Sequence, residues 1–434
     1  MSRENKFNNS NFGEQIYKWC CDLFPINRSI TGPGVRATLE YLKSEIPNLK
    51  IRNVKSKTKV FDWWVPLEWK VNKAYIKDPD GNKFIDFSDN NLHLVGYSTP
   101  FVGRMELNEL NDHLHSIEKQ PDAIPYVTSY YNETWGFCIK HNQRCKLKRG
   151  IYEVVVDTEI YPGYLNYGEV LIKGESKKEI FLSTYICHPS MANNELSGPT
   201  VTTAIVKWLN TLKNKKYSYR IVFIPETIGS ITYISRNLEQ LKKNVYAGFN
   251  ITCIGDNLCY SYLPSRSEDS ISDIVALHVL KHIDREFRKY PWHERGSDER
   301  QYCAPGIDLP IATIMRSKYA EYPEYHTSLD NLDFISPEGL YGGFTAIKRA
   351  IEILERNSKY IVTNLCEPNL GRRGLYPTLS TKESNDKIKD LTTILSYCDG
   401  EKTILEIAEK INLSFFDVEK IINKLQESDL IREL

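Results

Sequence analysis

The sequence predicts an α/β fold in which a mixed sheet is sandwiched by helices, interrupted by a small β-rich inserted domain and followed by a winged helix-turn-helix. Three observations lead to this prediction. Between residues 151 and 353, apolar strand candidates alternate with helical patterns, as they do in α/β layers. Residues 61–155 instead carry short aromatic runs separated by turns. Residues 387–434 contain three short helical patterns.

The main α/β domain is expected to comprise residues 1–60 and 156–367, so that the β-rich segment is an insertion. Apolar residues at helical spacing predict two helices near the start of the chain, at 12–24 and 35–46. Apolar runs predict buried strands at 169–172, 180–186, 219–224, 247–254 and 309–315. Further helices are predicted at 200–213, 230–237, 271–287 and 337–356.

The insertion and the C-terminal region carry local signals of their own. In the insertion, Asp78-Pro-Asp-Gly81 lies between two apolar runs and predicts a hairpin. Residues 368–386, rich in Gly, Ser and charge, are expected to be a linker to the winged helix-turn-helix at 387–434. The three helices of that module are predicted at 388–397, 404–411 and 415–427, and the LIREL segment at the end of the chain is expected to be a strand.

The charge balance speaks against a nucleic-acid partner. The 434 residues include 56 basic and 56 acidic side chains, for a net charge of +0. The composition therefore has no excess of Lys and Arg that could neutralise phosphates. The expected recognition helix at 415–427 is not basic either. We expect this module to serve docking or dimerisation, with DNA binding and transcriptional regulation as the weaker alternatives.

The sequence also indicates the compartment. The N-terminal residues contain no apolar signal segment, and no window is apolar enough for a membrane span. The ten cysteines are scattered without CxxC or Cys/His finger spacing, as is typical of reduced thiols. We expect a cytoplasmic protein without a membrane partner.

Three polar clusters follow predicted strands, where chemistry in α/β folds is found. The first contains His188 and, seven residues later, Glu195, directly after the strand at 180–186. A lone histidine is often structural, but the nearby carboxylate favours a metal ligand. The second cluster contains Glu226, which ends an otherwise apolar strand and is costly to bury without a cation or a proton. Glu226 is therefore the candidate general base, and a helix-start carboxylate satisfied by backbone amides is the alternative.

The third cluster contains His326, after the strand at 309–315. Hydroxyls and Asp330 in the same loop could fix the imidazole tautomer, as a metal-bound histidine requires. Two histidines and a carboxylate on separate loops, with one position left for water, have the composition of a catalytic zinc site. His278 and His282 have helical spacing, but no acidic partner frames them as ligands.

The order of these motifs resembles the zinc-dependent aminopeptidase family of the transferrin-receptor and glutaminyl-cyclase type. The segments that carry the resemblance are HPS…NNELSG, PETIGS, GFNIT, GSDERQY…GI and YHTSLDNLD. The broad resemblance covers about residues 150–355. More closely, the whole chain is similar to a bacterial group of aminopeptidase-like proteins with an inserted small domain and a C-terminal winged helix.

The resemblance assigns roles to individual positions. His188 and His326 match the first and last metal histidines, and Glu226 with Thr227 matches a pair of glutamates, general base then ligand. Asn194 and Thr252 stand where the family has metal-binding aspartates. Three carboxylate ligands are thus missing, which implies one zinc ion rather than two.

The third protein ligand has two candidates. Glu195, next to the lost aspartate, is the expected one, and a shift of the alignment by one residue would put Glu226 on the metal instead. Asp298 and Arg300 match a pocket-lining segment of the family and are expected to read substrate polarity.

These features predict a zinc-dependent hydrolase in which Glu226 deprotonates a water activated by the ion, and this water attacks an amide carbonyl. The expected substrate is a small peptide cleaved at its N-terminus. Related proteins resemble products encoded together with functions of surface-polysaccharide biosynthesis. An amide of an amino sugar is therefore the second expected class of substrate. The alternative function is that of an eroded peptidase-like scaffold whose insertion and winged helix recognise partners. The cluster of Trp63, Trp64 and Trp69 could be core, a lid over the site or the surface of a homo-oligomer.

Overall fold

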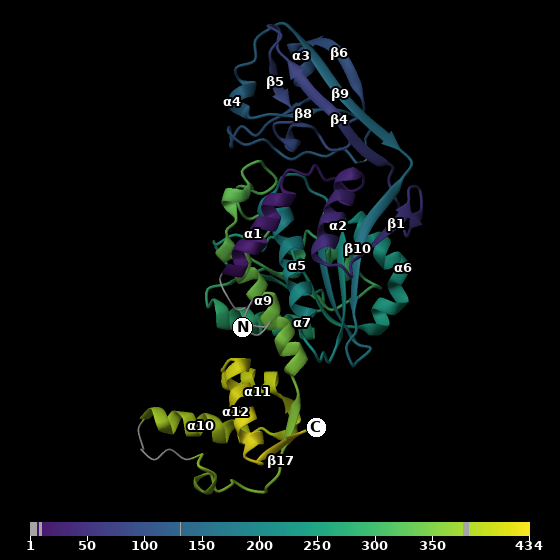
Figure 1. Ribbon diagram of the computed structural model, residues 1–434. Coiled ribbons are helices and arrows are strands. Elements are labelled where there is room, and N and C mark those ends of the chain that lie inside the picture. Colours follow the sequence, from purple (N-terminus) through teal and green to yellow (C-terminus); the bar gives the residue numbers. More distant parts are fainter. Residues whose placement is uncertain (1–6, 8–10, 131, 376–381) are drawn as a thin grey trace. The chain divides into compact units, whose positions relative to one another are not determined.

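The computed structural model describes residues 7, 11–130, 132–375 and 382–434 (Figure 1). Within it the chain divides into two compact units. The first unit comprises Met1–Ala276 and Glu286–Ile347, and the second comprises Leu277–Arg285 and Lys348–Leu434. In the described part of the chain, no helix is both long and apolar enough to cross a membrane.

The two predicted N-terminal helices are confirmed as α1 (Asn11–Leu23) and α2 (Pro33–Glu45). The large residues that α1 buries share one face of the helix at helical spacing: Phe12, Ile16, Trp19 and Leu23. Pro33 stands in the first turn of α2, where its fixed φ is suitable and its missing N–H costs nothing. Gly32 precedes it with a φ of 101°, a conformation that L side chains rarely adopt.

The first unit is built on a mixed eight-stranded sheet. Its strands are β1 (Lys50–Lys55), β10 (Tyr164–Ile172), β11 (Glu179–Tyr185), β12 (Ser218–Ile224), β13 (Val245–Asn250), β14 (Ser261–Leu263), β15 (Arg288–Lys289) and β16 (Ile311–Met315). The order is β1-β10-β12-β11-β13-β16-β14-β15. β12, β11, β13 and β16 pair in parallel at the centre, while β1, β10 and β14 join them antiparallel. All five predicted strands lie in this sheet.

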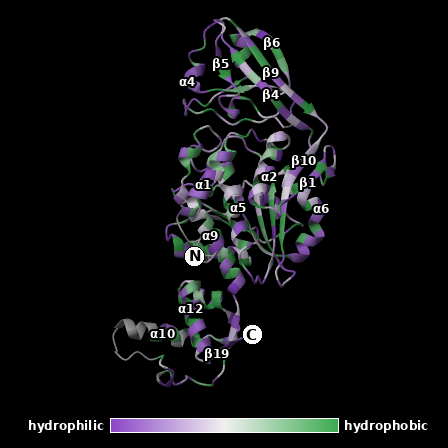
Figure 2. Cartoon of the chain, in the orientation of Figure 1, coloured by the Kyte–Doolittle hydropathy of each residue, from purple (hydrophilic) through white to green (hydrophobic). Residues whose placement is uncertain are grey.

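Helices flank the sheet, as the sequence predicts for an α/β fold (Figure 1). They are α5 (Ser197–Leu209), α6 (Ile228–Asn244), α7 (Ile271–Ile283), the short α8 (Glu299–Tyr302) and α9 (Pro337–Arg356). Short helical turns cover Ala192–Leu196, Trp292–Glu294 and Leu332–Phe334. Every residue of β11 is buried, including its polar residues Glu179, Ser183 and Thr184. The helices α1 and α9 each carry both hydrophobic and hydrophilic residues (Figure 2).

The insertion forms a smaller β-rich region around a four-stranded antiparallel sheet of order β5-β4-β9-β6. Its elements are β2 (Lys59–Val60), β3 (Trp63–Trp64), β4 (Glu68–Lys77), β5 (Lys83–Asp86), Asn91–His93, β6 (Phe101–Glu106), α3 (Leu107–Asn111), β7 (Leu114–His115), β8 (Phe137–Cys138), α4 (His141–Arg144) and β9 (Ile151–Tyr161). The hairpin predicted at Asp78 joins β4 to β5, and the N–H of Gly81 donates to the carbonyl of Asp78 at 2.9 Å. β9 then leads directly into β10 of the large sheet.

The second unit contains the winged helix. Its elements are β17 (Lys359–Val362), Gly371–Arg373, α10 (Lys382–Ser396), β18 (Asp399–Thr403), α11 (Ile404–Ile411), α12 (Phe415–Glu427) and β19 (Ile431–Glu433). β17 is the central strand of its sheet and pairs with both β18 and β19. The module therefore begins earlier than the sequence predicts, because its sheet needs a strand from before the expected linker. Residues 376–381 of that linker lie outside the described residues.

The start of α12 is covered within the second unit. The Nε2 atom of His278 on α7 accepts the backbone N–H of Phe415 at 2.8 Å, and its Nδ1 atom bonds to Glu409. The guanidinium of Arg356 lies 5.2 Å from the ring of Phe416. In helix-turn-helix proteins the first residues of the recognition helix contact base edges, so this packing argues against DNA as a partner. The absence of nucleic-acid binding stays a prediction.

Candidate active site

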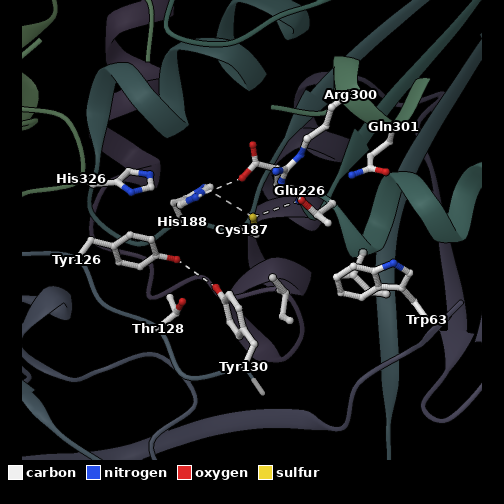
Figure 3. A pocket seen from close by; sticks show the side chains of 13 residues that line it. Trp63, Tyr126, Thr128, Tyr130, Cys187, His188, Glu226, Arg300, Gln301 and His326 are labelled. Carbon is white, nitrogen blue, oxygen red and sulfur yellow. Dashed lines mark hydrogen bonds and ion pairs between the residues drawn. The ribbon is translucent and has the colours of Figure 1, made fainter. Parts of the chain in front are cut away.

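The predicted clusters meet at one cavity of about 390 Å³ beyond the carboxyl ends of the central strands (Figure 3). The described residues that line it are Ile30, Trp63, Tyr126, Thr128, Tyr130, Cys187, His188, Glu226, Thr227, Ile228, Arg300, Gln301 and His326. Three loops far apart in the sequence supply His188, Glu226 and His326. Parallel strands end at the same edge of a sheet, and this is why the loops converge.

Glu195 contacts His188 on the Nδ1 side of its ring. One carboxylate oxygen of Glu195, Oε2, lies 3.0 Å from both the backbone nitrogen and Nδ1 of His188. The other ring nitrogen, Nε2, lies 3.7 Å from a carboxylate oxygen of Glu226. Burial lowers the pKa of His188, but Cys187, Glu195 and Glu226 together raise it well above 6.5. Glu195 thus orients the imidazole and directs Nε2 towards the cavity.

Glu195 itself is enclosed and paired with a cation. Its side chain and that of Arg28 are both 0% exposed, and the two form an ion pair of 3.4 Å. Arg28 also donates to the carbonyls of His188 and Leu23 at 2.9 and 2.7 Å. Glu195 therefore lies on the side of His188 opposite Glu226, and it is not among the described residues that line the cavity with His326. The expected ligand set of His188, Glu195 and His326 is not brought together around one point.

Replacing Glu195 by glutamine is expected to weaken zinc binding by about 10- to 100-fold without abolishing it, because an orienting partner is altered while the donor nitrogen remains. Competition with a chelator of known affinity measures this change. Glu14→Gln, which neutralises an exposed carboxylate on α1, is the matched control. Complete loss of zinc from Glu195→Gln would instead make Glu195 a direct ligand.

His326 has a free ring nitrogen in a strained backbone position. Its φ is 54°, and its buried Nε2 atom has no hydrogen-bond partner in the described structure. Burial, and then the charge of His188, lower the pKa of His326 to about 3, so its imidazole is neutral and has a lone pair available. The ring centroids of His188 and His326 are 5.4 Å apart.

Asp330 does not fix the tautomer of His326 as the sequence suggested. Its carboxylate instead accepts backbone N–H groups of Asn193 at 2.6 Å and Asn194 at 2.9 Å. It also accepts the hydroxyl of Tyr322 at 3.1 Å. Asp330 therefore connects the His326 loop to the turn that precedes α5, and it positions the two predicted metal loops relative to one another.

Glu226 lies two residues after the end of β12, and its carboxylate faces the cavity rather than capping α6. Its backbone N–H donates to the Sγ atom of Cys187 at 3.2 Å. Burial raises the pKa of Glu226, while the charges of His188 and Arg300 partly offset this rise. The next residue, Thr227, has a φ of 63° and begins α6 without a side-chain cap. This arrangement leaves a carboxylate with a raised proton affinity next to an imidazole.

Asp298 and Arg300, both predicted from the sequence to bind substrate, lie at different positions relative to the cavity. Arg300 lines the cavity, and its Nη2 atom donates to the hydroxyl of Thr227 at 2.6 Å. Asp298 is buried and is not among the described lining residues. Its Oδ1 atom accepts the backbone N–H of Thr227 at 2.8 Å and the hydroxyl of Ser230 at 2.7 Å. Asp298 thus holds the loop of Glu226 through hydrogen bonds with the two residues Thr227 and Ser230.

Burial, and then the negative charge of Glu226, raise the pKa of Asp298 to about 7 from 3.8. Since the folded-state pKa is above the unfolded one, the stabilising contribution is complete below pH 3.8 and is lost as the pH rises through about 7. Asp298→Asn should therefore gain about 2 kcal/mol relative to the unaltered protein when the pH is raised from 5 to 8. Urea denaturation at both values measures this. A difference that is the same at both values would contradict the raised pKa.

Several cavity residues come from the insertion, which the sequence did not connect with the site. The ring of Tyr126 lies 5.3 Å from that of His188 and 5.1 Å from that of His326. Its hydroxyl lies 3.1 Å from that of Tyr130, and its backbone N–H donates to the carbonyl of His326 at 2.9 Å. No motif marks these tyrosines in the sequence, and only the folded chain brings them to the histidines.

The three tryptophans of this cluster lie in three different environments. Trp69 is buried in the core, with its indole N–H donating to the carbonyl of Ser98. Trp63 lines the cavity, and Trp64 is exposed. Of the interpretations from the sequence, the core is confirmed for Trp69, whereas the lid and the homo-oligomer surface stay predictions.

Two of the three positions of the missing carboxylates, Asn194 and Thr252, belong to a neutral hydrogen-bond network. The hydroxyl of Tyr185 lies 2.7 Å from the amide nitrogen of Asn194 and 2.6 Å from the hydroxyl of Thr252. The Oδ1 atom of Asn194 is buried and has no partner in the described structure. A network without negative charge does not suit two divalent ions side by side.

The donor set fits one zinc ion at the cavity. His188 and His326 line the cavity and offer imidazole nitrogens. Asn194 is not among the described lining residues, but its buried Oδ1 atom is a neutral oxygen without a described partner. Cys187, His188 and Glu195 also have donor atoms within 4.8 Å of one another. However, burial raises the pKa of the Cys187 thiol to about 11, and Glu195 is already paired with Arg28. Because the carboxylate of Glu195 is engaged by both Arg28 and the Nδ1 atom of His188, this second group already has partners for its donor atoms without an ion.

Comparisons with known proteins agree with this architecture. A family described as a domain of unknown function (DUF4910) matches residues 17–357, and a winged helix-turn-helix family matches residues 358–433. A Clostridium acetobutylicum protein, named as a polysaccharide biosynthesis protein with an aminopeptidase-like domain, is 43% identical over 441 residues that span 100% of both chains.

Solved structures extend the comparison. The crystal structure of a Clostridium acetobutylicum protein named as a peptidase is 42% identical, with a TM-score of 0.93 over 99% of each chain. A zinc aminopeptidase from Bacillus subtilis shares the fold, with 12% identity and a TM-score of 0.56 over 79% of this chain and 94% of that one. The resemblance and the fold class predicted from the sequence are thereby confirmed. The chain belongs to this family of aminopeptidase-like proteins, in which a DUF4910 domain is followed by a winged helix-turn-helix.

Proposed function

We propose that the protein is a zinc-dependent amide hydrolase with Glu226 as its general base. The observation that carries the proposal is the meeting of three groups in one cavity: the Nε2 atom of His188, the unpaired Nε2 atom of His326 and the carboxylate of Glu226. The peptidase-like fold and the name of the Clostridium relative support a hydrolase.

One zinc ion would be held by His188, by His326 and, as third donor, by the Oδ1 atom of Asn194. When bound, the ion would supply Lewis-acid chemistry that activates water and polarises the amide carbonyl. Glu195 is assigned to orienting His188, and Glu226 is assigned to proton transfer rather than to the metal. This assignment replaces both third ligands considered from the sequence.

Glu226 would act twice in the reaction. Its carboxylate first takes a proton from the attacking water and later gives that proton to the leaving amine. The raised proton affinity of Glu226 suits both steps, since a base that is too weak cannot take the proton. Tyr126 and Tyr130 bring hydroxyl groups to the same cavity and can donate hydrogen bonds to the substrate.

The substrate would be small, in keeping with a cavity of about 390 Å³. A peptide N-terminus and an amino-sugar amide are the two classes expected from the sequence. The name of the Clostridium relative supports the second class, because polysaccharide biosynthesis handles acylated amino sugars. We place this activity in the cytoplasm.

Metal content together with hydrolysis of aminoacyl and N-acyl-sugar amides tests the proposal. We expect one zinc per chain and turnover that a chelator removes. His326→Ala should lose zinc, Asn194→Asp should bind it about tenfold more tightly because a charged ligand is restored, and His293→Ala, at an exposed histidine, should change neither. A protein that binds no zinc, or that hydrolyses no amide when loaded, would favour the scaffold alternative.

A further inference from the structure

The cavity carries one carboxylate and one permanently charged cation. Among the described residues that line it, Glu226 is the only acidic side chain and Arg300 is the only arginine or lysine. In the proposed reaction Glu226 exchanges a proton with water and with the amine, so it is engaged in the chemistry. No second carboxylate of the lining is left to pair with the α-ammonium group of a peptide N-terminus.

Hydrogen bonds anchor the backbone segment that carries Arg300. This residue belongs to α8, and the two residues before it, Asp298 and Glu299, are buried carboxylates that anchor this segment. Asp298 binds the start of α6 through Thr227 and Ser230. The Oε1 atom of Glu299 accepts the backbone N–H groups of Gly296 and Ser297 at 2.9 Å. The backbone that carries Arg300 is therefore fixed before a ligand arrives, and the bond from its Nη2 atom to Thr227 restrains the guanidinium. Both restraints lower the entropic cost of binding.

The guanidinium of Arg300 also has N–H donors that are not used in its hydrogen bond to Thr227. Its Nη2 atom donates to the hydroxyl of Thr227 at 2.6 Å, and no ion pair between described residues includes Arg300. An arginine presents five N–H donors in a planar fork that matches a carboxylate with two parallel hydrogen bonds. Gln301 lies beside it in the lining and offers a further amide donor.

The position of Arg300 relative to Glu226 indicates which half of the substrate it would meet. The charge of Arg300 acts on Glu226, and both side chains project into the same side of the cavity (Figure 3). In the proposed reaction Glu226 delivers its proton to the leaving amine, so the amine half lies next to Glu226. A group on that half is then within reach of Arg300.

We propose that the substrate carries a carboxylate on the amine half of its amide bond and that Arg300 is the residue that recognises it. This inference rests on the proposed function and narrows it to N-acylated amines with an adjacent carboxylate, such as an N-acyl amino acid or an N-acyl amino-uronic acid. Hydrolysis adds water across the C–N bond: the water oxygen goes to the acyl carbon, a proton goes to the amine, and no redox partner is needed.

Matched substrates that differ in one charge test the inference on the zinc-loaded protein. N-acetyl-leucine should be hydrolysed with a kcat/KM about 100-fold higher than N-acetyl-leucinamide, because a charge-assisted paired hydrogen bond is lost in the amide. Arg300→Gln should lower kcat/KM for the carboxylate substrate about 100-fold, mainly through KM, and should change that for the amide less than about threefold. Arg104→Gln, at an exposed arginine of the inserted sheet, should leave both unchanged.

The outcomes separate the roles that Arg300 could have. If Arg300 only adjusts Glu226, then Arg300→Gln lowers kcat for both substrates equally and the inference is overturned. Preference for leucyl-leucinamide, whose amine is free and whose C-terminus is neutral, would also overturn it. N-acetylated amino-uronic acids in the same assay show whether the carboxylate belongs to a sugar or to an amino acid.

A binding measurement keeps this inference separate from the proposed function. Calorimetry on the zinc-free protein should detect leucine, the free amine product, but not leucinamide, and Arg300→Gln should remove the leucine signal. Arg300-dependent binding without any hydrolysis would refute the proposed function and leave the carboxylate site standing. Equal hydrolysis of the acid and the amide would refute the carboxylate site and leave the hydrolase standing.

Discussion

Glu226→Gln is expected to lower kcat by about 10²- to 10⁴-fold, the usual contribution of a general acid–base group, while the protein keeps its zinc. Glutamine has nearly the same shape as glutamate but cannot take a proton from water at neutral pH. The Nε2 atom of His188, 3.7 Å away, would lose a charged neighbour but would remain in place, because Glu195 and Arg28 hold the ring from the other side.

Steady-state kinetics and metal analysis on the same sample measure this effect. Glu159→Gln is the matched control, since Glu159 is an exposed carboxylate that pairs with Lys70 in the inserted sheet. Two results would change the assignment. Unaltered turnover in Glu226→Gln would show that the base lies elsewhere, and loss of zinc would make Glu226 a ligand, as the shifted alignment allows.

Arg28→Met should destabilise the fold by about 3–5 kcal/mol, because it leaves the charge of Glu195 buried without a partner. Both side chains are 0% exposed, and Arg28 also satisfies the carbonyls of His188 and Leu23. The effect should appear in urea denaturation as a lower midpoint with an unchanged slope. Zinc affinity should fall as well, since the support of His188 is disturbed.

A double variant shows whether the cause is the unpaired charge. Arg28→Met combined with Glu195→Gln should recover at least half of the lost stability, because the buried charge is then removed too. The surface pair Lys18 and Asp22 is the comparison, with side chains 65% and 35% exposed, and Lys18→Met should cost less than about 1 kcal/mol. A small effect of Arg28→Met would show that the buried pair of Arg28 and Glu195 is not a main source of stability.

The elements of the first unit were predictable because their signals are local. The apolar run at 180–182 lies in β11, which is buried throughout, and α1 shows its buried stripe at helical spacing. The start of the winged helix was harder to find. β17 lies before the predicted linker and is recognisable as part of that module only through its pairing with β18 and β19.

The site was predictable in its residue types and less so in their roles. His188, Glu226 and Arg300 reach the cavity as expected because each lies on a loop or short helix at one edge of the sheet. Glu195 and Asp298 were expected to face a ligand, but both are buried behind the lining. Short distance along the chain does not reveal on which side of a ring a carboxylate lies.

The sequence by itself determined the fold class, the three polar loops that meet at the cavity and the loss of carboxylates expected for a second metal. These follow from hydrophobic periodicity and from residue identity, which are properties of short segments. Only the tertiary structure decided that Glu195 supports His188 from behind, that Tyr126 of the insertion covers both histidines, and that Arg300 enters the cavity without an acidic partner among the described residues. Each of these depends on contacts between segments far apart in the chain, and no local pattern encodes the distance between them.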